Sequence, residues 1–279
     1  MVTARAPSSH GAFADELRRQ ARRVVRVAGF GAVTAAMLPA YALREALLDD
    51  ASRDRVRDRW IGAWSDALLR LYEVHVEASG CTPVAATRGR LVVANHRSTI
   101  DIAILLRAFG GHMVSRGDLA RWPLLGAAAR KVGTVFVDRA DPFSGATAVR
   151  AMRDLLKRGH TVIVFAEGTT FPDDVVRPFH PGAFVAATHC DAEIVPVGLA
   201  YERGSGAAFL DESFGAHLAR VSAAEPTRVV MRIGAPIVVE DNARSAKLRH
   251  RTHAAVQALV DEARAVCDAS SGTSERRAT

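Results

Sequence analysis

The chain has 279 residues, of which 49% are hydrophobic and 24% are charged. This length and composition suit a globular protein of one or two domains, and they exclude a disordered tail, a collagen-like repeat and a disulfide-stapled miniprotein. The net charge of +7 suits a partner that carries phosphate. Three separated cysteines, Cys81, Cys190 and Cys267, indicate a reducing compartment and argue against a zinc cluster.

The N-terminal segment is basic and then apolar. Arginines crowd residues 18–26, and residues 27–43 carry no charge. As a helix, this uncharged stretch spans about 25 Å, which is less than the roughly 30 Å hydrocarbon core of a bilayer. We therefore expect a helix that embeds in one leaflet or crosses poorly, weakened further by Pro39. The arginines would face the anionic lipids of the cytoplasmic side.

Two alternatives fit the same segment. One is a cleaved signal peptide that ends at Ala40-Tyr41-Ala42, and the other is a buried core helix. Residues 52–76 follow, with Trp60, Trp64 and other apolar side chains at helical spacing. They predict an amphipathic helix that pairs with the first helix or lies in the membrane interface.

From about residue 88, short apolar runs alternate with longer amphipathic ones. This alternation is typical of an α/β sheet with helices on both faces. The predicted strands are Leu91–Ala94, His112–Ser115, Thr134–Val137, Thr161–Ala166, Ile194–Ala200 and Arg228–Ile233. The predicted helices are 100–108, 123–131, 144–158, 182–189 and 243–267. The chain would divide into a basic polar N-terminus (1–24), a membrane-associating helical pair (25–80), an α/β domain (81–268) and a disordered tail (269–279).

Polar residues follow the first predicted strand, where α/β proteins place reactive groups. The segment reads Asn95-His96-Arg97-Ser98-Thr99-Ile100-Asp101. A histidine followed five residues later by a carboxylate can form a general base whose tautomer the carboxylate fixes. The alternative interpretation is a helix N-cap at Ser98 or Thr99, with Asp101 stabilising the helix dipole.

Two further strands end in polar residues. Strand 134–137 precedes Asp138-Arg139, and strand 161–166 precedes Glu167-Gly168-Thr169-Thr170. Taken alone, Arg139 predicts a surface ion pair and Glu167 a solvated acid. Pro196, inside strand 194–200, predicts an edge strand, a bulge or a special bend.

In order, the segments NHRSTID, GTVFVDR, FAEGTT and IVPVGLA resemble the four sequence blocks of the glycerolipid acyltransferases. This superfamily includes the 1-acylglycerol-3-phosphate acyltransferases and related lysophospholipid acyltransferases. The resemblance covers roughly residues 85–205. It implies a central mixed β-sheet flanked by helices, as in glycerol-3-phosphate acyltransferases, with an N-terminal two-helix membrane motif like the pair expected at residues 25–80.

The resemblance also implies a reaction. A fatty acyl group would pass directly from acyl-CoA or acyl-carrier protein to the hydroxyl of a lysolipid, with no bound cofactor. His96 would take the hydroxyl proton, Asp101 would orient His96, and Arg139 would bind the acceptor phosphate. The implied substrate-binding residues are Asn95, Ser98, Arg139, Glu167, Gly168, Thr169 and Pro196. The protein would be peripheral or monotopic on the cell membrane, on a surface with anionic lipid, with its catalytic domain facing the cytoplasm.

One position departs from the resemblance. The third block often reads EGTR, and its arginine helps to bind acceptor phosphate, but here the position is Thr170. Arg177 is a nearby substitute in the sequence. The acceptor expected first is 1-acylglycerol-3-phosphate, which would give phosphatidic acid. A lysophospholipid with a larger head group or a lyso-ornithine lipid is the alternative.

Competing functions fit less well. A serine hydrolase that uses Ser98 lacks the G-x-S-x-G motif, and a metal site lacks H-E-x-x-H. A nucleic-acid partner is not expected, because aromatic residues make up 6% of the chain and the arginines are scattered. A non-catalytic membrane-binding protein of the same fold would have lost His96, Asp101 or Glu167, and all three are present.

Overall fold

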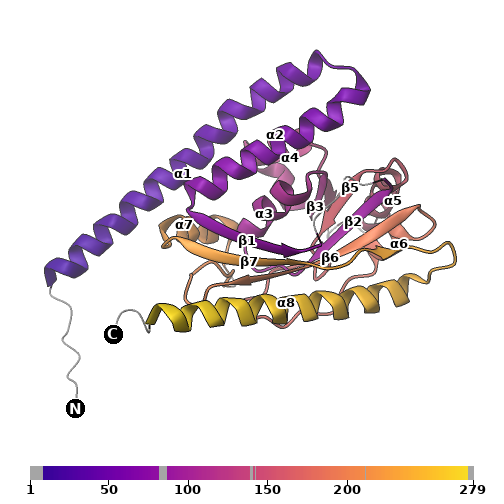
Figure 1. The fold of residues 1–279 in the computed structure, drawn as a ribbon. Helices are drawn as coiled ribbons and strands as arrows, with labels where there is room; N and C mark the ends of the chain where they lie inside the picture. The colour runs from indigo at the N-terminus through magenta and orange to yellow at the C-terminus, as the bar shows by residue number, and fades with distance from the viewer. Residues whose placement is uncertain (1–8, 82–86, 139–140, 142, 211, 276–279) are drawn as a thin grey trace.

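The computed structural model describes residues 9–81, 87–138, 141, 143–210 and 212–275 (Figure 1). In this part of the chain, eight strands form one mixed sheet with the order β1-β7-β6-β2-β5-β3-β4, and β8 pairs with β6. The strands are β1 Val74–Gly80, β2 Gly89–Ala94, β3 His112–Arg116, β4 Val135–Val137, β5 Thr161–Val164, β6 Ala192–Tyr201, β7 Thr227–Ile233 and β8 Ile237–Val238. The predicted class, an α/β fold with a central mixed sheet flanked by helices, is confirmed.

The helices cover both faces of the sheet. They are α1 Ser9–Ala46, α2 Asp50–Leu71, α3 Ile100–Phe109, α4 Leu125–Lys131, α5 Ser144–Lys157, α6 Gly182–Ala187, α7 Phe214–Ala223 and α8 Ser245–Glu275, with a short 3₁₀ helix at Gly117–Arg121. In Figure 1, α8 lies along one side of the sheet, and α1 and α2 lie on the opposite side.

Alternation along the central strands divides the core into two layers. Leu91 and Val93 of β2 pack in one cluster with residues of α5, α6 and α8. Val92 and Ala94 pack in a second cluster with residues of α2, α3 and α7. This arrangement follows from the two-residue period of a strand. Central strands buried on both faces explain why their sequences read as continuous apolar runs.

The helix predicted over residues 52–76 is wrong at its C-terminal end. The α2 helix ends at Leu71, and β1 begins at Val74, which pairs in parallel with Thr227 of β7. Glu73 lies between them with a φ of 54°, in the left-handed region that ends helices. The segment 25–80 therefore includes one strand of the domain's own sheet.

The α1 helix runs from Ser9 through Pro39 to Ala46, so the boundary expected at residue 25 falls inside one helix. Its stretch Phe13–Ala46 is long and apolar enough to cross a membrane, and its most apolar part is only 17% buried. Such low burial argues against the core-helix alternative and fits a membrane-associating N-terminus.

The expectation that the arginines of residues 18–26 all face lipid is wrong for Arg26, which is 3% exposed. Its guanidinium donates to the carbonyl of Leu71 at 3.2 Å and to that of Ala224 at 2.6 Å, and it pairs with Glu73 at 2.7 Å. The last carbonyls of a helix have no partner within the helix, so a buried guanidinium can satisfy them. Arg26 thus joins α1 to the ends of α2 and α7.

The disordered tail expected from residue 269 is also wrong as far as residue 275, where α8 ends. Cys267 of α8 is 2% exposed and packs with Ala200 and Val230. The helix continues from this packed residue to Glu275. Extending an existing helix costs little, because only the first turn is unfavourable to form. Residues 276–279 lie outside the described part of the chain.

Candidate active site

His96 and Glu167 follow neighbouring strands. Strand β2 pairs in parallel with β5, with Val93 opposite Val164, so the carboxyl ends of both strands meet at one edge of the sheet. Reactive groups of α/β sheets gather at this edge. His96 lies in the loop after β2, and Asp101 lies in the first turn of α3, as the spacing predicted.

Asp101 holds His96 in one orientation. The Nδ1 atom of His96 lies 2.9 Å from Oδ2 of Asp101, a residue with 0% exposure. The same oxygen accepts the backbone N–H of Arg97 at 2.7 Å and that of Ser98 at 2.8 Å. An ionised carboxylate accepts all three, so Nδ1 of His96 carries its proton and donates it. The lone pair then lies on Nε2, the nitrogen that can act as a base.

Two residues of the loop after β5 position the base further. The ring of Phe165 stacks on the imidazole of His96 at 3.8 Å with an interplanar angle of 7°. Glu167 accepts the backbone N–H of His96 at 2.9 Å with one oxygen and that of Arg177 at 2.8 Å with the other. Burial raises the pKa of the Glu167 carboxyl, and the two N–H donors oppose this shift. Both carboxylate oxygens of Glu167 therefore accept hydrogen bonds from backbone N–H groups.

Asn95 and Ser98 make structural contacts. The Asn95 amide donates to the carbonyl of Leu199 at 3.0 Å and accepts its N–H at 2.8 Å, which extends the pairing of β2 with β6. The hydroxyl of Ser98 has no exposure, accepts the N–H of Ile100 at 3.3 Å and lies 3.4 Å from Nε2 of His217. Such local contacts fix the loop that carries the base.

Gly168 and Thr169 follow Glu167 directly in the loop after β5. Gly168 has a φ of 76° and donates to the carbonyl of Phe165, which turns the chain after β5. Thr169 follows it and is half-buried. Arg139 lies outside the residues that the structure describes, as does any contact it makes.

Pro196 lies in an interior strand, so the edge-strand interpretation is wrong. It pairs with Val93 of β2, and its carbonyl accepts the N–H of Gly234 at 2.9 Å. Gly234 lies between β7 and β8, where the neighbouring ladder is interrupted. The missing N–H of proline is tolerated at such an interruption. The side chain faces α8, because a Cβ at Gly234 would meet both Leu259 and the Pro196 ring, and this is the face opposite α3.

Tyr201, whose hydroxyl donates to Oδ1 of Asp101, is not among the site residues predicted from the sequence. Tyr201 is 3% exposed, and burial raises its pKa well above 10. The signal that could have found it is the two-residue period of β6. Val197, Leu199 and Tyr201 share the face that α3 covers, and Tyr201 alone of these three has a polar group.

His217 of α7 was also not identified. It has 0% exposure, its Nδ1 lies 3.1 Å from Glu212, and its Nε2 accepts the N–H of Thr99 at 3.4 Å. Burial lowers the pKa of His217, in agreement with a neutral ring that donates from Nδ1 and accepts at Nε2. The helix α7 thus contacts the loop that carries His96.

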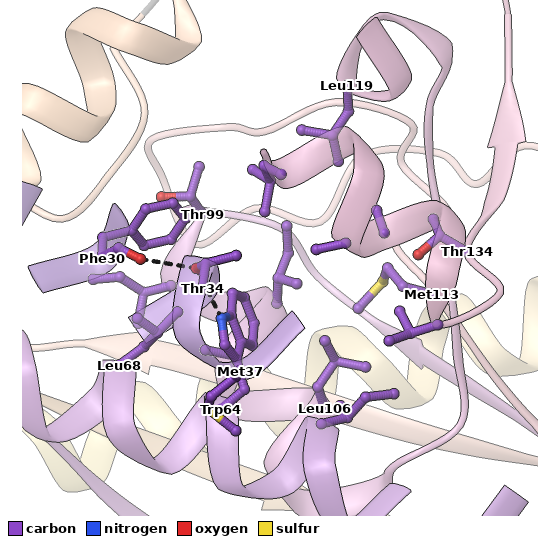
Figure 2. A pocket seen from close by; sticks show the side chains of 18 of the residues that line it. Phe30, Thr34, Met37, Trp64, Leu68, Thr99, Leu106, Met113, Leu119 and Thr134 are labelled. Atoms are coloured by element: carbon purple, nitrogen blue, oxygen red, sulfur yellow. Dashed lines mark hydrogen bonds between the residues drawn. The ribbon is translucent and has the colours of Figure 1, made fainter. Parts of the chain in front are cut away.

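An apolar pocket begins beside this loop (Figure 2). Thr99, Ile100, Ala103 and Leu106 line it along one face of α3, which extends it by about 10 Å from the first of these residues to the last. Helix α1 supplies Phe30, Thr34, Met37, Leu38 and Tyr41. The indole of Trp64 in α2 donates to the hydroxyl of Thr34, which itself donates to the carbonyl of Phe30. Cleavage after Ala42 would remove this wall.

One group of metal-binding side chains occurs in the described part of the chain, at Asp54, His112 and His160. The Nε2 atom of His112 lies 2.8 Å from the guanidinium of Arg57, and its Nδ1 lies 2.8 Å from the carbonyl of Gly133. Because both nitrogens of His112 are occupied and a cation lies beside them, the group does not fit a metal ion.

Comparison with known proteins identifies the family. Residues 75–200 match the family model described as Acyltransferase. A lyso-ornithine lipid O-acyltransferase from Pseudomonas aeruginosa is 30% identical over 220 residues, which cover 77% of this chain and 83% of that protein. The chain belongs to the acyltransferase family. All four sequence blocks lie within the matched residues, and the match ends at Ala200, one residue before Tyr201.

Two further relatives support the family and the fold of this acyltransferase. A 1-acyl-sn-glycerol-3-phosphate acyltransferase from Neisseria gonorrhoeae is 27% identical over 157 residues, 56% of this chain and 61% of that protein. The crystal structure of the 1-acyl-sn-glycerophosphate acyltransferase from Thermotoga maritima matches with a TM-score of 0.67 and 22% identity, over 88% of this chain and 97% of that one. The latter shows a common fold.

Proposed function

We propose that this acyltransferase moves a fatty acyl group from the thioester of acyl-CoA or acyl-carrier protein to the free hydroxyl of a lysolipid. His96 is the general base and Asp101 orients it. The observation that carries the proposal is the His96–Asp101 pair, which keeps the lone pair on Nε2 in the same loop as Thr99, a residue that lines an apolar pocket.

The reaction needs no covalent acyl-enzyme. Nε2 of His96 takes the proton of the lysolipid hydroxyl as its oxygen attacks the thioester carbonyl carbon. The new C–O bond forms, the C–S bond breaks, and the imidazolium returns its proton to the thiolate that leaves. The buried carboxylate of Asp101 stabilises the transient imidazolium.

The apolar pocket supports a long acyl chain as the group transferred. Its lining runs from Thr99, three residues from His96, to Leu106 and Met113 at the opposite end of α3. Burying each methylene group in such a pocket contributes about 0.8 kcal/mol. A chain of many methylene groups therefore gains enough to be held with its carboxyl end near His96.

We take 1-acylglycerol-3-phosphate as the first acceptor, with phosphatidic acid as product and Arg139 as the phosphate ligand. Lyso-ornithine lipid is the second acceptor, favoured by Thr170 at the position where the resemblance implies arginine. A relative named for acyl transfer to lyso-ornithine lipid matches over 83% of its length. Arg177 supplies a guanidinium nearby, stacked on Phe171 and paired with Asp173.

The apolar α1 helix supports a peripheral or monotopic position on the cell membrane, with the catalytic domain on the cytoplasmic side. Arg18, Arg19 and Arg23 are exposed and would contact anionic lipid. Both acceptor and product reside in the bilayer, so a membrane-bound enzyme meets its substrate without extracting it.

The test is an acyl-transfer assay on the full chain in detergent with radiolabelled oleoyl-CoA. The acceptor panel holds lysophosphatidic acid, head-grouped lysophospholipids and lyso-ornithine lipid. His96→Ala should abolish transfer to every acceptor while vesicle binding survives, and His250→Ala, an exposed histidine on α8, is the matched control. Turnover retained in His96→Ala would overturn the mechanism. Transfer to lyso-ornithine lipid alone would replace the first acceptor with the second.

A further inference from the structure

The carboxylate of Asp101 is divided between two sets of donors. Oδ2 accepts hydrogen bonds from Nδ1–H of His96 and from the backbone N–H groups of Arg97 and Ser98. Oδ1 accepts a hydrogen bond from the hydroxyl of Tyr201, which is the last residue of β6. Each donor to a carboxylate withdraws negative charge from it and lowers its basicity. The Tyr201 hydroxyl therefore acts on the same charge that stabilises the imidazolium of His96.

We infer that Tyr201 is a positioning residue that sets the basicity of His96 through Asp101. The inference rests on the proposed function, since it takes His96 as the base of acyl transfer. Tyr201 is not among the described residues that line the apolar pocket, and its hydroxyl bonds the Asp101 carboxylate, which in turn bonds Nδ1 of His96.

The phenol is held so that it can serve only as a donor toward Asp101. Burial and the neighbouring carboxylate raise its pKa well above 10, so it stays protonated at any pH at which the enzyme would be assayed. The Ser98 hydroxyl also interacts with the phenol. That hydroxyl lies 3.4 Å from His217, so a run of polar contacts joins α7 to the base.

Other charged or titratable groups surround the His96–Asp101 pair without contacting Oδ1 in the described part of the chain. The Arg97 guanidinium turns away to Asp174 and the carbonyl of Pro172. Glu167 binds backbone N–H groups, and His217 binds Ser98 and Thr99. These other groups are Arg97, Glu167, Arg177 and His217, whereas Tyr201 contacts Oδ1 directly.

Removal of the hydroxyl has a defined consequence. In Tyr201→Phe, Oδ1 of Asp101 loses its donor while the ring still fills the same space. The carboxylate becomes more basic and stabilises the imidazolium of His96 more strongly. A general base works when it is neutral, and the acid limb of the kcat profile therefore moves to higher pH. We expect a shift of about one pH unit, a loss of about tenfold in kcat below that limb, and recovery of kcat above it.

The experiment measures kcat for the full chain in detergent from pH 5.5 to 9.5, with saturating oleoyl-CoA and lysophosphatidic acid (or lyso-ornithine lipid, if that is the acceptor turned over). Thr252→Val is the matched control, because it deletes a fully buried hydroxyl from α8, on the opposite face of the sheet. A defect in folding alone would lower kcat at every pH and leave the limb in place. The KM for the acceptor should stay the same within about twofold.

A second variant reverses the sign. Site-specific 3-fluorotyrosine at position 201 makes the phenol a stronger donor in nearly the same volume, so the acid limb should move to lower pH. This variant keeps the test decisive where Tyr201→Phe fails to fold. Opposite shifts in the two variants support the inference, and a limb that stays in place in a folded variant overturns it. His96→Ala distinguishes failure of the proposed function from failure of the inference on Tyr201. If His96→Ala keeps turnover, the proposed function fails. If His96→Ala is inactive while the acid limb stays in place in both Tyr201 variants, only the role of Tyr201 fails.

Discussion

The Glu167 side chain accepts the backbone N–H of His96 at 2.9 Å. Its second carboxylate oxygen accepts the N–H of Arg177 at 2.8 Å, so one side chain joins the loop after β2 to the loop that follows β5. The carboxylate is buried, and both of its oxygens are hydrogen-bonded to the backbone. Glu167 therefore determines where the base stands.

Glu167→Gln should damage the position of His96 more than the binding of acceptor. Glutamine offers one acceptor oxygen, and its NH₂ group would face a backbone N–H, so one of the two hydrogen bonds is lost. We expect a lower melting temperature and a fall of about tenfold in kcat, with the acceptor KM within about twofold of wild type. Steady-state kinetics and thermal unfolding in detergent check both.

Glu262→Gln, at an exposed position of α8, is the control that should change neither quantity. A Glu167→Gln enzyme with normal stability and normal kcat but a much higher acceptor KM would contradict this role. It would instead support the interpretation, drawn from the sequence blocks, that Glu167 lines the acceptor site.

The central strands and the edge strand β4 were predictable from the sequence, and the edge strand β1 was not. β2, β5 and β6 are buried on both faces and read as runs of valine, isoleucine and leucine. β1 follows a helical pattern directly and is largely exposed at the edge beside β7, so its alternation is faint. α7 was missed because two of its three buried residues, His217 and Ser222, are polar.

The site divides in the same way. His96, Asp101 and Glu167 were predictable, because strand ends and a five-residue spacing mark them. Tyr201 lies 100 residues from Asp101 in the sequence, and the contact exists only because β6 pairs with β2. Phe165 reads as one more apolar residue of a strand until its ring is found on His96. Non-local pairing decides both roles: the two-residue period of β6 shows which face Tyr201 occupies, but not that Asp101 lies against it.

The apolar pocket predicts a limit on acyl-chain length. Ala129 of α4 lines it, and its carbonyl accepts the N–H of Thr134, which lies across the pocket from Thr99 (Figure 2). Ala129→Phe should block the far end and raise the preference for decanoyl-CoA over oleoyl-CoA, measured as the ratio of kcat/KM values, by about tenfold. Ala127→Phe, on the same helix but outside the lining, is the matched control. An unchanged ratio in Ala129→Phe would place the acyl chain elsewhere.

The arginines of α1 should separate into two functional groups. Arg26 is buried against two carbonyls and Glu73, so Arg26→Gln should lower the free energy of unfolding by about 2 kcal/mol. Arg23 is exposed, and Arg23→Gln should leave stability intact but weaken binding to anionic vesicles about fivefold. Thermal unfolding and vesicle sedimentation measure the two effects. Equal vesicle-binding losses with no loss of stability in Arg26→Gln would contradict the burial of Arg26.

Stability should fall in mild acid because of His112. This residue is 7% exposed, and its burial beside Arg57 lowers its pKa to about 4, against 6.5 for a free histidine. Between these pH values the unfolded chain binds a proton that the folded chain does not, so the free energy of unfolding decreases as the pH falls. From pH 7 to pH 5 the titration of His112 should lower the free energy of unfolding by about 2 kcal/mol.

His112→Gln keeps a donor and an acceptor without titrating, so the stability of this variant should depend less on pH. Denaturant unfolding in detergent at both pH values gives the slope, and His250→Gln, at an exposed position, should keep that of the wild type. A His112→Gln slope equal to that of the wild type would assign the acid sensitivity to other groups.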